Sequence, residues 1–143
     1  MAVILAVIAA VAGGNLAVTS SPARPHVGRR VVFRATGQVG DKGHLYLYRE
    51  TGRNCGQSAG AERRRGVRMV SRAIDGSFDL QVFHTPRRTG RLLVCAYLYA
   101  DACDAAGQNC GPATGLPPDA GFAQIRVRVR AAAARPSGSR ATP

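Results

Sequence analysis

Short apolar runs recur along this chain at even spacing, and turn-forming residues separate them. Within the runs apolar and polar residues alternate, as in residues 30–36 and 77–84. This two-residue period places apolar side chains on one face of a strand, whereas no segment after Leu16 keeps the 3.6-residue period of a helix. About seven such strands predict an all-β chain, built as an antiparallel sandwich of two sheets or, alternatively, as a barrel.

Glycine, proline and aspartate bound the expected strands. Strands are predicted over residues 16–18, 30–36, 44–50, 67–74, 77–84, 91–100 and 121–130. Residues 91–100 are apolar on both faces, which predicts a central strand covered on both sides. Turns are expected at residues 37–43, at Asp75-Gly76 and at residues 85–90. Loops are expected over residues 52–66 and 101–120.

The N-terminus is an unbroken apolar run from Ala2 to Ala12. It has the length of the apolar part of a secretory signal peptide, and it is too short to span a bilayer. Ala10 and Ala12 form the small-x-small pattern that a signal peptidase prefers, so residues 1–12 are interpreted as a signal peptide. Two alternatives remain: a buried first strand or helix, and an uncleaved anchor that runs on to about Ser20.

Residues 13–130 are then expected to form one domain, because a chain of this length suits one domain and not two. Residues 131–143 are rich in alanine, proline and serine, and this composition predicts a disordered tail. A signal peptide predicts a place outside the cytoplasm, with the protein either secreted or held at the cell envelope.

The chain contains 4 cysteines, and an even number in an exported chain indicates two disulfides with three possible pairings. Cys95 lies on the most buried of the expected strands, so its partner must come from a distant element. Cys103 and Cys110 flank a flexible segment that can close a small ring. We therefore favour Cys55 with Cys95 and Cys103 with Cys110. The spacings do not match those of zinc ligands, and we expect no metal or cofactor.

Three segments carry a resemblance to a known family: HLYLYRETGRNC (44–55), DGSFDLQVFHTP (75–86) and GRLLVCAYLYA (90–100). A strand leading to a loop cysteine, a Gly-x-Phe strand and a Gly-led strand with Cys-Ala-Tyr follow in that order. In this respect residues 16–129 resemble the immunoglobulin-like domains found in secreted proteins of high-GC bacteria. The resemblance implies an immunoglobulin-like antiparallel β-sandwich outside the cytoplasm. It implies no functional residues, because such domains usually serve as spacers or adhesive modules.

Catalysis is not expected from the residues present. An enzyme site needs a nucleophile with a base, or paired carboxylates, in a cleft. The chain has 8 acidic residues, and most of them fall in expected turns, where aspartate suits the backbone. The long loop is rich in side-chain oxygen, supplied by Asp101, Asp104, Asn109 and Asp119. Their spacing matches no known calcium loop, so a structural loop is the favoured interpretation.

The formal net charge is +12, and Lys42 is the only lysine. Two arginine rows are the candidate anion-binding residues: Arg63, Arg64, Arg65 and Arg68 in one, and Arg126, Arg128 and Arg130 in the other. The second row projects from one face of a strand at intervals of about 6.6 Å, a spacing that could follow a polyanion backbone. Arginine, alanine, glycine and proline all abound, as expected of a GC-rich genome, so a solvated face is the favoured interpretation of both rows.

The sequence thus predicts an exported, non-catalytic structural or binding module. The alternative is a polyanion-binding surface protein that uses the arginine rows, and a small secreted enzyme or inhibitor ranks last. The partner stays open between an anionic cell-envelope polymer and another envelope protein. Sequence-specific binding of nucleic acid is not expected, because no aromatic residues interleave with the arginines.

Overall fold

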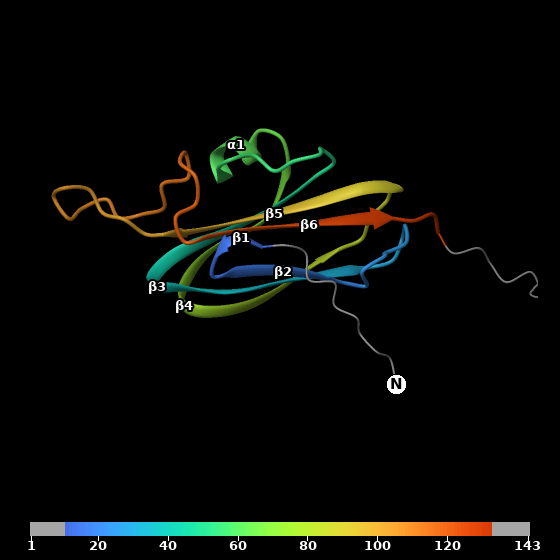
Figure 1. Ribbon diagram of the computed structural model, residues 1–143, viewed down its shortest axis with the longest axis horizontal. Helices are drawn as coiled ribbons and strands as arrows, with labels where there is room; N and C mark the ends of the chain where they lie inside the picture. Colours follow the sequence, from blue (N-terminus) through green and yellow to red (C-terminus); the bar gives the residue numbers. More distant parts are fainter. Residues whose placement is uncertain (1–10, 133–143) are drawn as a thin grey trace, which may run out of the picture.

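The computed structural model describes residues 11–132. These residues form six strands and one short helix: β1 (Val11–Gly14), β2 (Leu16–Ser21), β3 (Val31–Glu50), α1 (Ala59–Arg63), β4 (Val67–His84), β5 (Gly90–Ala100) and β6 (Gly121–Val129). All pairs of these strands are antiparallel, and the sheet curls into a half-barrel (Figure 1). The prediction of an all-β antiparallel fold is confirmed. Within the described part of the chain, no helix has the length and apolar character needed to cross a membrane.

β3 is the strand around which the sheet curls. The strand order is β1-β6-β5-β3-β2, and β4 also pairs with β3. The first part of β3 pairs with β2, from Ser21↔Val32 to Leu16↔Gly37, whereas its last part pairs with β5. β4 follows β3 along almost its whole length. A single ribbon of β3 and β4 therefore joins the β2 side of the fold to the β5–β6 side.

Two of the predicted turns are wrong. Residues 37–43 lie inside β3, and residues 75–76 lie inside β4. Four expected strands are therefore two long ones, and the described residues form six strands where about seven were expected. The pairing of β3 with β4 shifts in register between Gln38 and Lys42, which marks a bulge where the ribbon bends.

The glycines at this bend allow the backbones of neighbouring segments to approach β3 closely. A Cβ atom on Gly37 would collide with the carbonyl oxygen of Asn15, just before β2. A Cβ atom on Gly43, on the other side of the bulge, would collide with the carbonyl oxygen of Tyr99 on β5. The glycines that suggested a turn instead let neighbouring strands approach the bending strand.

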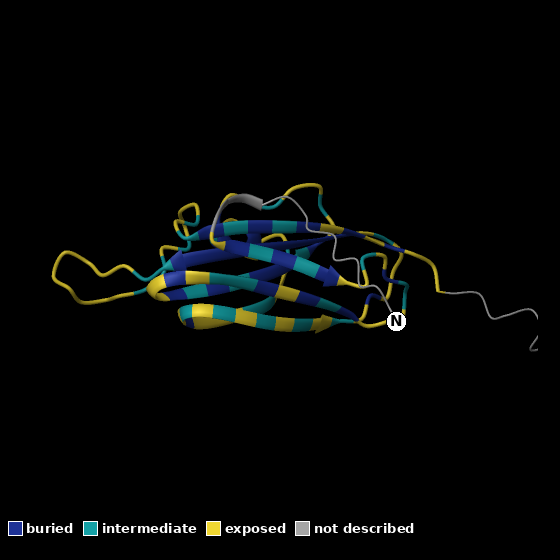
Figure 2. Ribbon diagram, turned by 60° about the horizontal axis from the view of Figure 1, so that its bottom comes forward, coloured by how far each residue is buried: buried dark blue, intermediate teal, exposed yellow. Residues whose placement is uncertain are grey.

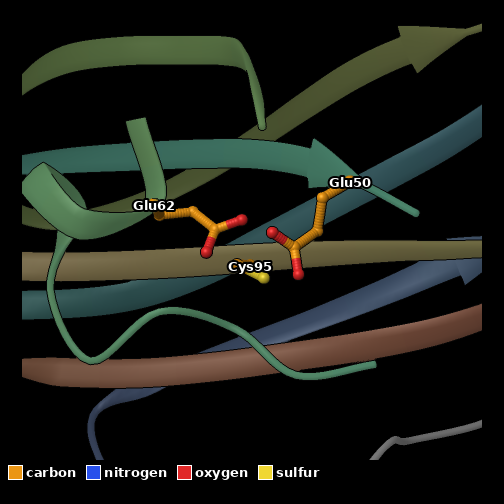
Figure 3. Close-up of side chains that lie close together, drawn as sticks. All are labelled: Glu50, Glu62 and Cys95. Carbon is orange, nitrogen blue, oxygen red and sulfur yellow. The ribbon is translucent and has the colours of Figure 1, made fainter. Parts of the chain in front are cut away.

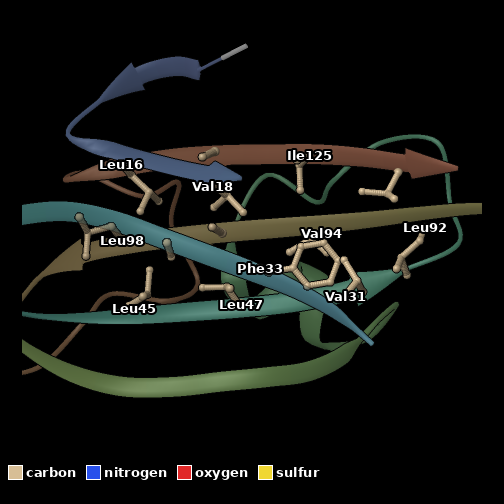
Figure 4. Close-up of a cluster of buried hydrophobic side chains, with 14 of the residues drawn as sticks. Leu16, Val18, Val31, Phe33, Leu45, Leu47, Leu92, Val94, Leu98 and Ile125 are labelled. Atoms are coloured by element: carbon tan, nitrogen blue, oxygen red, sulfur yellow. The ribbon is translucent and has the colours of Figure 1, made fainter. Parts of the chain in front are cut away.

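The main core lies inside the curl. Figure 4 shows side chains of β2, β3, β5 and β6 meeting there, among them Phe33, Leu47 and Val94, which are fully buried. Burying a side chain of this size contributes about 1.5–3 kcal/mol. The predicted inward faces of β3, β5 and β6 supply this core, and Figure 2 shows how buried residues alternate with more exposed ones along the strands.

β5 is covered on both faces, as its sequence predicted. Every residue from 92 to 99 is buried, and the outer face carries Leu93, Cys95, Tyr97 and Tyr99. Residues 51–66, which connect β3 to β4 and include α1, cover this outer face, and we call them the roof (Figure 1). The sequence predicted a loop here and did not identify α1.

Three contacts hold the roof against β5. The Tyr97 hydroxyl donates to the carbonyl oxygen of Gly56 at 2.6 Å. The Tyr99 hydroxyl accepts from the backbone N–H of Ala59 at 2.9 Å. A disulfide joins Cys55 of the roof to Cys95, and the second disulfide joins Cys103 to Cys110 in the loop after β5. These two bonds have the pairing that the sequence favoured.

The described residues cover only part of the predicted signal peptide and of the predicted tail. Residues 1–10 and 133–143 lie outside the described residues, so most of the signal peptide and most of the tail stay predictions. Val11 and Ala12, the last residues of the predicted signal peptide, lie in β1, which pairs with β6 through Val11↔Ala123 and Gly14↔Gly121.

Candidate anion-binding groove

A groove of about 880 Å³ lies where β4 ends and β5 begins. Its walls are the last residues of β4, the connection 85–89 and the first residues of β5, with Arg49 of β3 and Val129 of β6. The connection is fixed because the carbonyl oxygen of Pro86 accepts a hydrogen bond from Gly28 at 2.9 Å. The volume falls in the range of about 300–1,000 Å³ that small-molecule sites occupy.

Arginine dominates the lining of this groove. Arg49, Arg87, Arg88 and Arg91 line it, and no Asp or Glu among residues 11–132 does so. A concave surface with one sign of charge focuses the electrostatic potential and attracts ions of the opposite sign. The planar guanidinium group also binds pairs of oxygens on phosphate, sulfate or carboxylate.

Three smaller hollows continue this surface. A hollow of about 160 Å³ shares Arg49 with the groove and adds Arg65. Hollows of about 280 Å³ and 380 Å³ share Arg91 with it and reach Arg126, the first of them also Arg128. Because each hollow shares lining residues with the groove, the groove and the three hollows lie next to one another. We call their arginines the arginine track: Arg49, Arg53, Arg65, Arg87, Arg88, Arg91, Arg126 and Arg128.

The strand register concentrates charge in this track. Arg91 lies opposite Arg128 in the β5–β6 ladder. Like charges that face each other across a ladder destabilise it. Arg126 donates to two neutral acceptors, the carbonyl oxygen of Arg53 at 2.9 Å and Oδ1 of Asn54 at 3.2 Å. These contacts therefore bring no negative charge to the arginines on this face of the sheet.

Carboxylates are scarce along the track. Within residues 11–132, Arg65 is the only track arginine with an ion pair, at 3.4 Å from Oε1 of Glu50. Arg34 and Asp79, which form another ion pair, lie on the β3–β4 ribbon away from the groove lining. The track is thus a strip of mostly unpaired guanidinium groups.

His84 and Phe83 add a polar and an apolar contact to the groove. Burial lowers the pKa of His84, and the positive charge of Arg49 lowers it further. The neutral imidazole can donate one hydrogen bond and accept another. The Phe83 ring is 53% exposed, and the guanidinium carbon of Arg30 lies 4.8 Å from the ring centroid.

The structure divides the arginines that the sequence singled out. Arg65, Arg126 and Arg128 belong to the track. The other four lie outside the groove and its three hollows: Arg63 and Arg64 at the end of α1, Arg68 on β4 and Arg130 just after β6. Sequence reasoning missed the other five arginines of the track: Arg49, Arg53, Arg87, Arg88 and Arg91. The adjacent Arg87-Arg88 in an expected turn was the one available signal.

A second cluster that the sequence did not predict is a buried pair of carboxyls. Glu50, at the end of β3, and Glu62, on α1, point toward one another under the roof (Figure 3). Glu62 is fully buried, and Glu50 is 6% exposed. An oxygen of each and the sulfur of Cys95 lie within 4.8 Å of one another, but Cys95 is in a disulfide and offers no thiolate to a metal.

This environment shifts the ionisation of the pair. Burial, together with the nearby carboxyl of Glu62, raises the pKa of Glu50 to about 7. Oε2 of Glu62 accepts a hydrogen bond from the backbone N–H of Gly56 at 2.6 Å. Paired carboxyls are a common catalytic device, but Glu62 is fully buried and lines neither the groove nor its three hollows. Glu50 lines the hollow of about 160 Å³, so a substrate there would meet one carboxyl of the pair.

The oxygen-rich loop uses its carboxylates in structural contacts. Asp104 accepts hydrogen bonds from two backbone N–H groups of its own turn. Asp119 accepts one from the N–H of Ala100 at 2.9 Å, and Asp101 lies 2.7 Å from Nδ1 of His44. These contacts agree with the structural interpretation of the loop.

Comparisons with known proteins show no family. No protein-family model and no curated protein matches the chain. Among solved structures, the chain is similar to part of the Pseudomonas fluorescens alkylpurine DNA glycosylase AlkC bound to DNA containing an abasic site analog. The TM-score is 0.40 at 9% identity, and the match covers 82% of this chain and 31% of that chain. Likeness at this level carries no argument about function.

Proposed function

We propose that this protein is a non-catalytic, extracytoplasmic binding module that holds an anionic polymer along the arginine track. The observation that carries the proposal is the 880 Å³ groove with four arginines and no carboxylate in its described lining. A polymer with regularly spaced anionic groups suits this surface because the track continues through three neighbouring hollows.

The strand register supports an anionic ligand. The opposition of Arg91 and Arg128 costs stability in the free protein, and an anion between the two guanidinium groups would offset that cost. Burial is the main cause of the lowered pKa of His84, and the positive charge of Arg49 lowers it further, which is a second like-charge contact at this surface. An anion bound here would relieve both unfavourable interactions at once.

Binding rather than catalysis fits the groups in the groove. In the described lining, His84 is the one side chain that titrates near neutral pH, and no Asp, Glu or Cys accompanies it. Acid–base or nucleophilic chemistry would need a second such group beside it. The guanidinium groups instead offer fixed charge and paired hydrogen-bond donors.

The proposal includes an immunoglobulin-like sandwich and a place outside the cytoplasm. The bend in β3 and β4 supports two packed halves, one with β2 and one with β5, β6 and β1. The disulfide between Cys55 and Cys95 matches the loop and strand cysteines on which the resemblance depends. Two disulfides in a small all-β domain are compatible with an oxidising compartment.

An NMR titration with inorganic polyphosphate tests the proposed function. We expect shifts of backbone amides and arginine Nε–H groups to concentrate in residues 84–91 and 126–128, with smaller changes at Arg63 and Arg64. Neutral dextran at equal mass concentration is the control and should leave these signals in place. Shifts spread evenly over the exposed arginines would contradict a built site and indicate attraction by net charge alone.

A further inference from the structure

The chain has two glutamates, and they form the buried pair. Oε2 of Glu50 and Oε1 of Glu62 have no hydrogen-bond partner. The two side chains come from different elements, β3 and the roof helix, and point toward one another (Figure 3). A buried ionised carboxylate without a partner is strongly disfavoured, so the pair needs compensation.

Arg65 supplies compensation for one carboxylate. Its Nη2 lies 3.4 Å from Oε1 of Glu50 and donates to the carbonyl oxygen of Asn54 at 2.8 Å. The Arg65 side chain is 46% exposed, whereas that of Glu50 is 3% exposed, so solvent screens part of the guanidinium charge. One screened positive charge faces two buried carboxyls, which leaves the cluster one positive charge short of neutrality.

The other groups around the pair do not supply that charge. Tyr97 of β5 lies 3.5 Å from Oε2 of Glu62, and burial with the nearby carboxyls raises its pKa, so it stays neutral. Burial likewise raises the pKa of Tyr48 on β3. Arg63 at the end of α1 and Arg68 on β4 act on Tyr48, and both are exposed to solvent.

We propose that Glu50 and Glu62 share one proton, and that this proton latches the roof onto β5. With the proton in place, one carboxyl donates a hydrogen bond to the other, and Arg65 offsets the remaining negative charge. Without the proton, two buried carboxylates repel one another, and the helix that carries Glu62 is driven away from Glu50. The latch shares Arg65 with the arginine track, but it uses none of the four arginines that line the groove itself.

The latch controls the part of the roof that comes after the disulfide-bonded Cys55 along the chain. Cys55 ties the roof covalently to β5, so the segment up to Cys55 stays attached. Beyond it, Gly56 donates to Glu62 at 2.6 Å, and Gly60 donates to the carbonyl oxygen of Thr114 at 2.9 Å. Ionisation of the pair should therefore loosen residues 56–66 and leave the strands intact.

A metal ion would be a poor substitute for the proton. The pair offers two free carboxyl oxygens, and the neighbouring sulfur of Cys95 is held in a disulfide. Calcium and magnesium need about six oxygen ligands, and a pair this deeply buried leaves little room for water to supply the rest. A shared proton balances the charge with no further ligand.

Carbon-13 labelling of glutamate tests the shared proton in the wild-type protein. Because the pair contains both glutamates of the chain, the two carboxyl signals report on this site alone. We expect the pair to lose its protons in two separate steps, the last of them near neutral pH. Ionisation of both carboxyls below pH 5, or a titration displaced by calcium or magnesium and restored by EDTA, would overturn the proposal.

Hydrogen exchange tests the latch itself. Between pH 5.5 and 8.5 we expect the protection factors of amides in residues 56–66 to fall about tenfold, with those in β5 unchanged. Glu62→Gln keeps a hydrogen-bond donor next to Glu50 and cannot ionise, so it should remove this fall. Glu50→Gln should do the same if Glu62→Gln does not fold.

Asp79→Asn is the matched control for this experiment. Asp79 is an exposed carboxyl whose pKa is lowered by hydrogen bonding and charge from Arg34, so its loss should leave the pH response of the roof intact. Equal protection of residues 56–66 at both pH values in the wild type would overturn the latch. The same would follow if Asp79→Asn removed the pH response as fully as Glu62→Gln.

Discussion

Arg91 of β5 and Arg128 of β6 face each other directly across the antiparallel ladder. Both side chains are exposed, and both line the hollow that adjoins the groove. Facing charges of the same sign lower the stability of a sheet, so a contribution to folding stability does not explain this pair. We interpret it as part of the binding surface for an anion.

Arg128→Gln tests this interpretation on the free protein. Removing one of the two charges should raise the free energy of unfolding by about 0.2–1 kcal/mol at low salt, because the repulsion disappears. The gain should shrink at high salt, where the repulsion is already screened. Urea unfolding at two salt concentrations measures both effects. A loss of stability of the same size at both concentrations would instead assign Arg128 a packing role.

Under the proposed function, His84 should make the binding of an anion sensitive to pH. Its pKa lies below the ordinary value of 6.5 in the free protein because of burial and Arg49. A bound anion offsets the charge of Arg49 and raises that pKa, so the complex takes up a proton. Affinity for polyphosphate should therefore increase as the pH falls through 6.5 and below.

Calorimetry near pH 6, in buffers with different ionisation heats, measures this proton uptake. We expect uptake of less than one proton per site in the wild type, lost in His84→Asn and kept in His26→Asn. His26 is a suitable control because its Nδ1 contacts the carbonyl oxygen of Ala131, outside the groove lining. Proton release on binding would contradict the assignment.

The two disulfides should contribute unequally to stability. The Cys55–Cys95 bond spans 40 residues and ties the roof to a buried strand, so replacing both cysteines by alanine should cost about 4 kcal/mol. The Cys103–Cys110 bond spans 7 residues in an exposed loop, and its removal should cost about 2.5 kcal/mol. Urea unfolding of the two double variants checks the order. A larger loss from the loop bond would show that the loop supports the core.

The sequence predicted strands well where one face of each strand is buried. Val31, Phe33 and Ala35 alternate with more exposed residues, and the structure buries this face as the alternation indicates. The apolar run 92–99 likewise predicted a strand covered on both sides. Burial of side chains sets the local pattern in these segments, so the pattern can be read without knowledge of the neighbours.

The bend between the two halves could not be predicted in the same way. Glycines at positions 37, 40 and 43 suit either a turn or a bulge, and local sequence does not separate the two. The pairing of β3 with β2 on one side of the bulge and with β5 on the other decides the outcome. That information lies in residues far from the glycines along the chain.

Prediction of the candidate site would have required the same long-range information. Arg49 and Arg87 meet because β3 ends and β4 ends at the same groove, not because of any motif. Glu50 and Glu62 looked like ordinary charged residues near a loop, and their burial depends on the fold of the roof over β5. The arginine rows drew attention in the sequence because they are contiguous or periodic. Apart from the adjacent Arg87 and Arg88, their partners in the track are neither.

The slope of binding against salt tests the anion groove most directly. For polyphosphate, the logarithm of affinity should fall linearly with the logarithm of salt, by about one unit per contact. Changing Arg87, Arg88 and Arg91 to glutamine should lower that slope by about three, whereas the same change at Arg63, Arg64 and Arg68 should barely alter it. Both variants lose the same charge, so equal slopes for the two variants would contradict a specific groove.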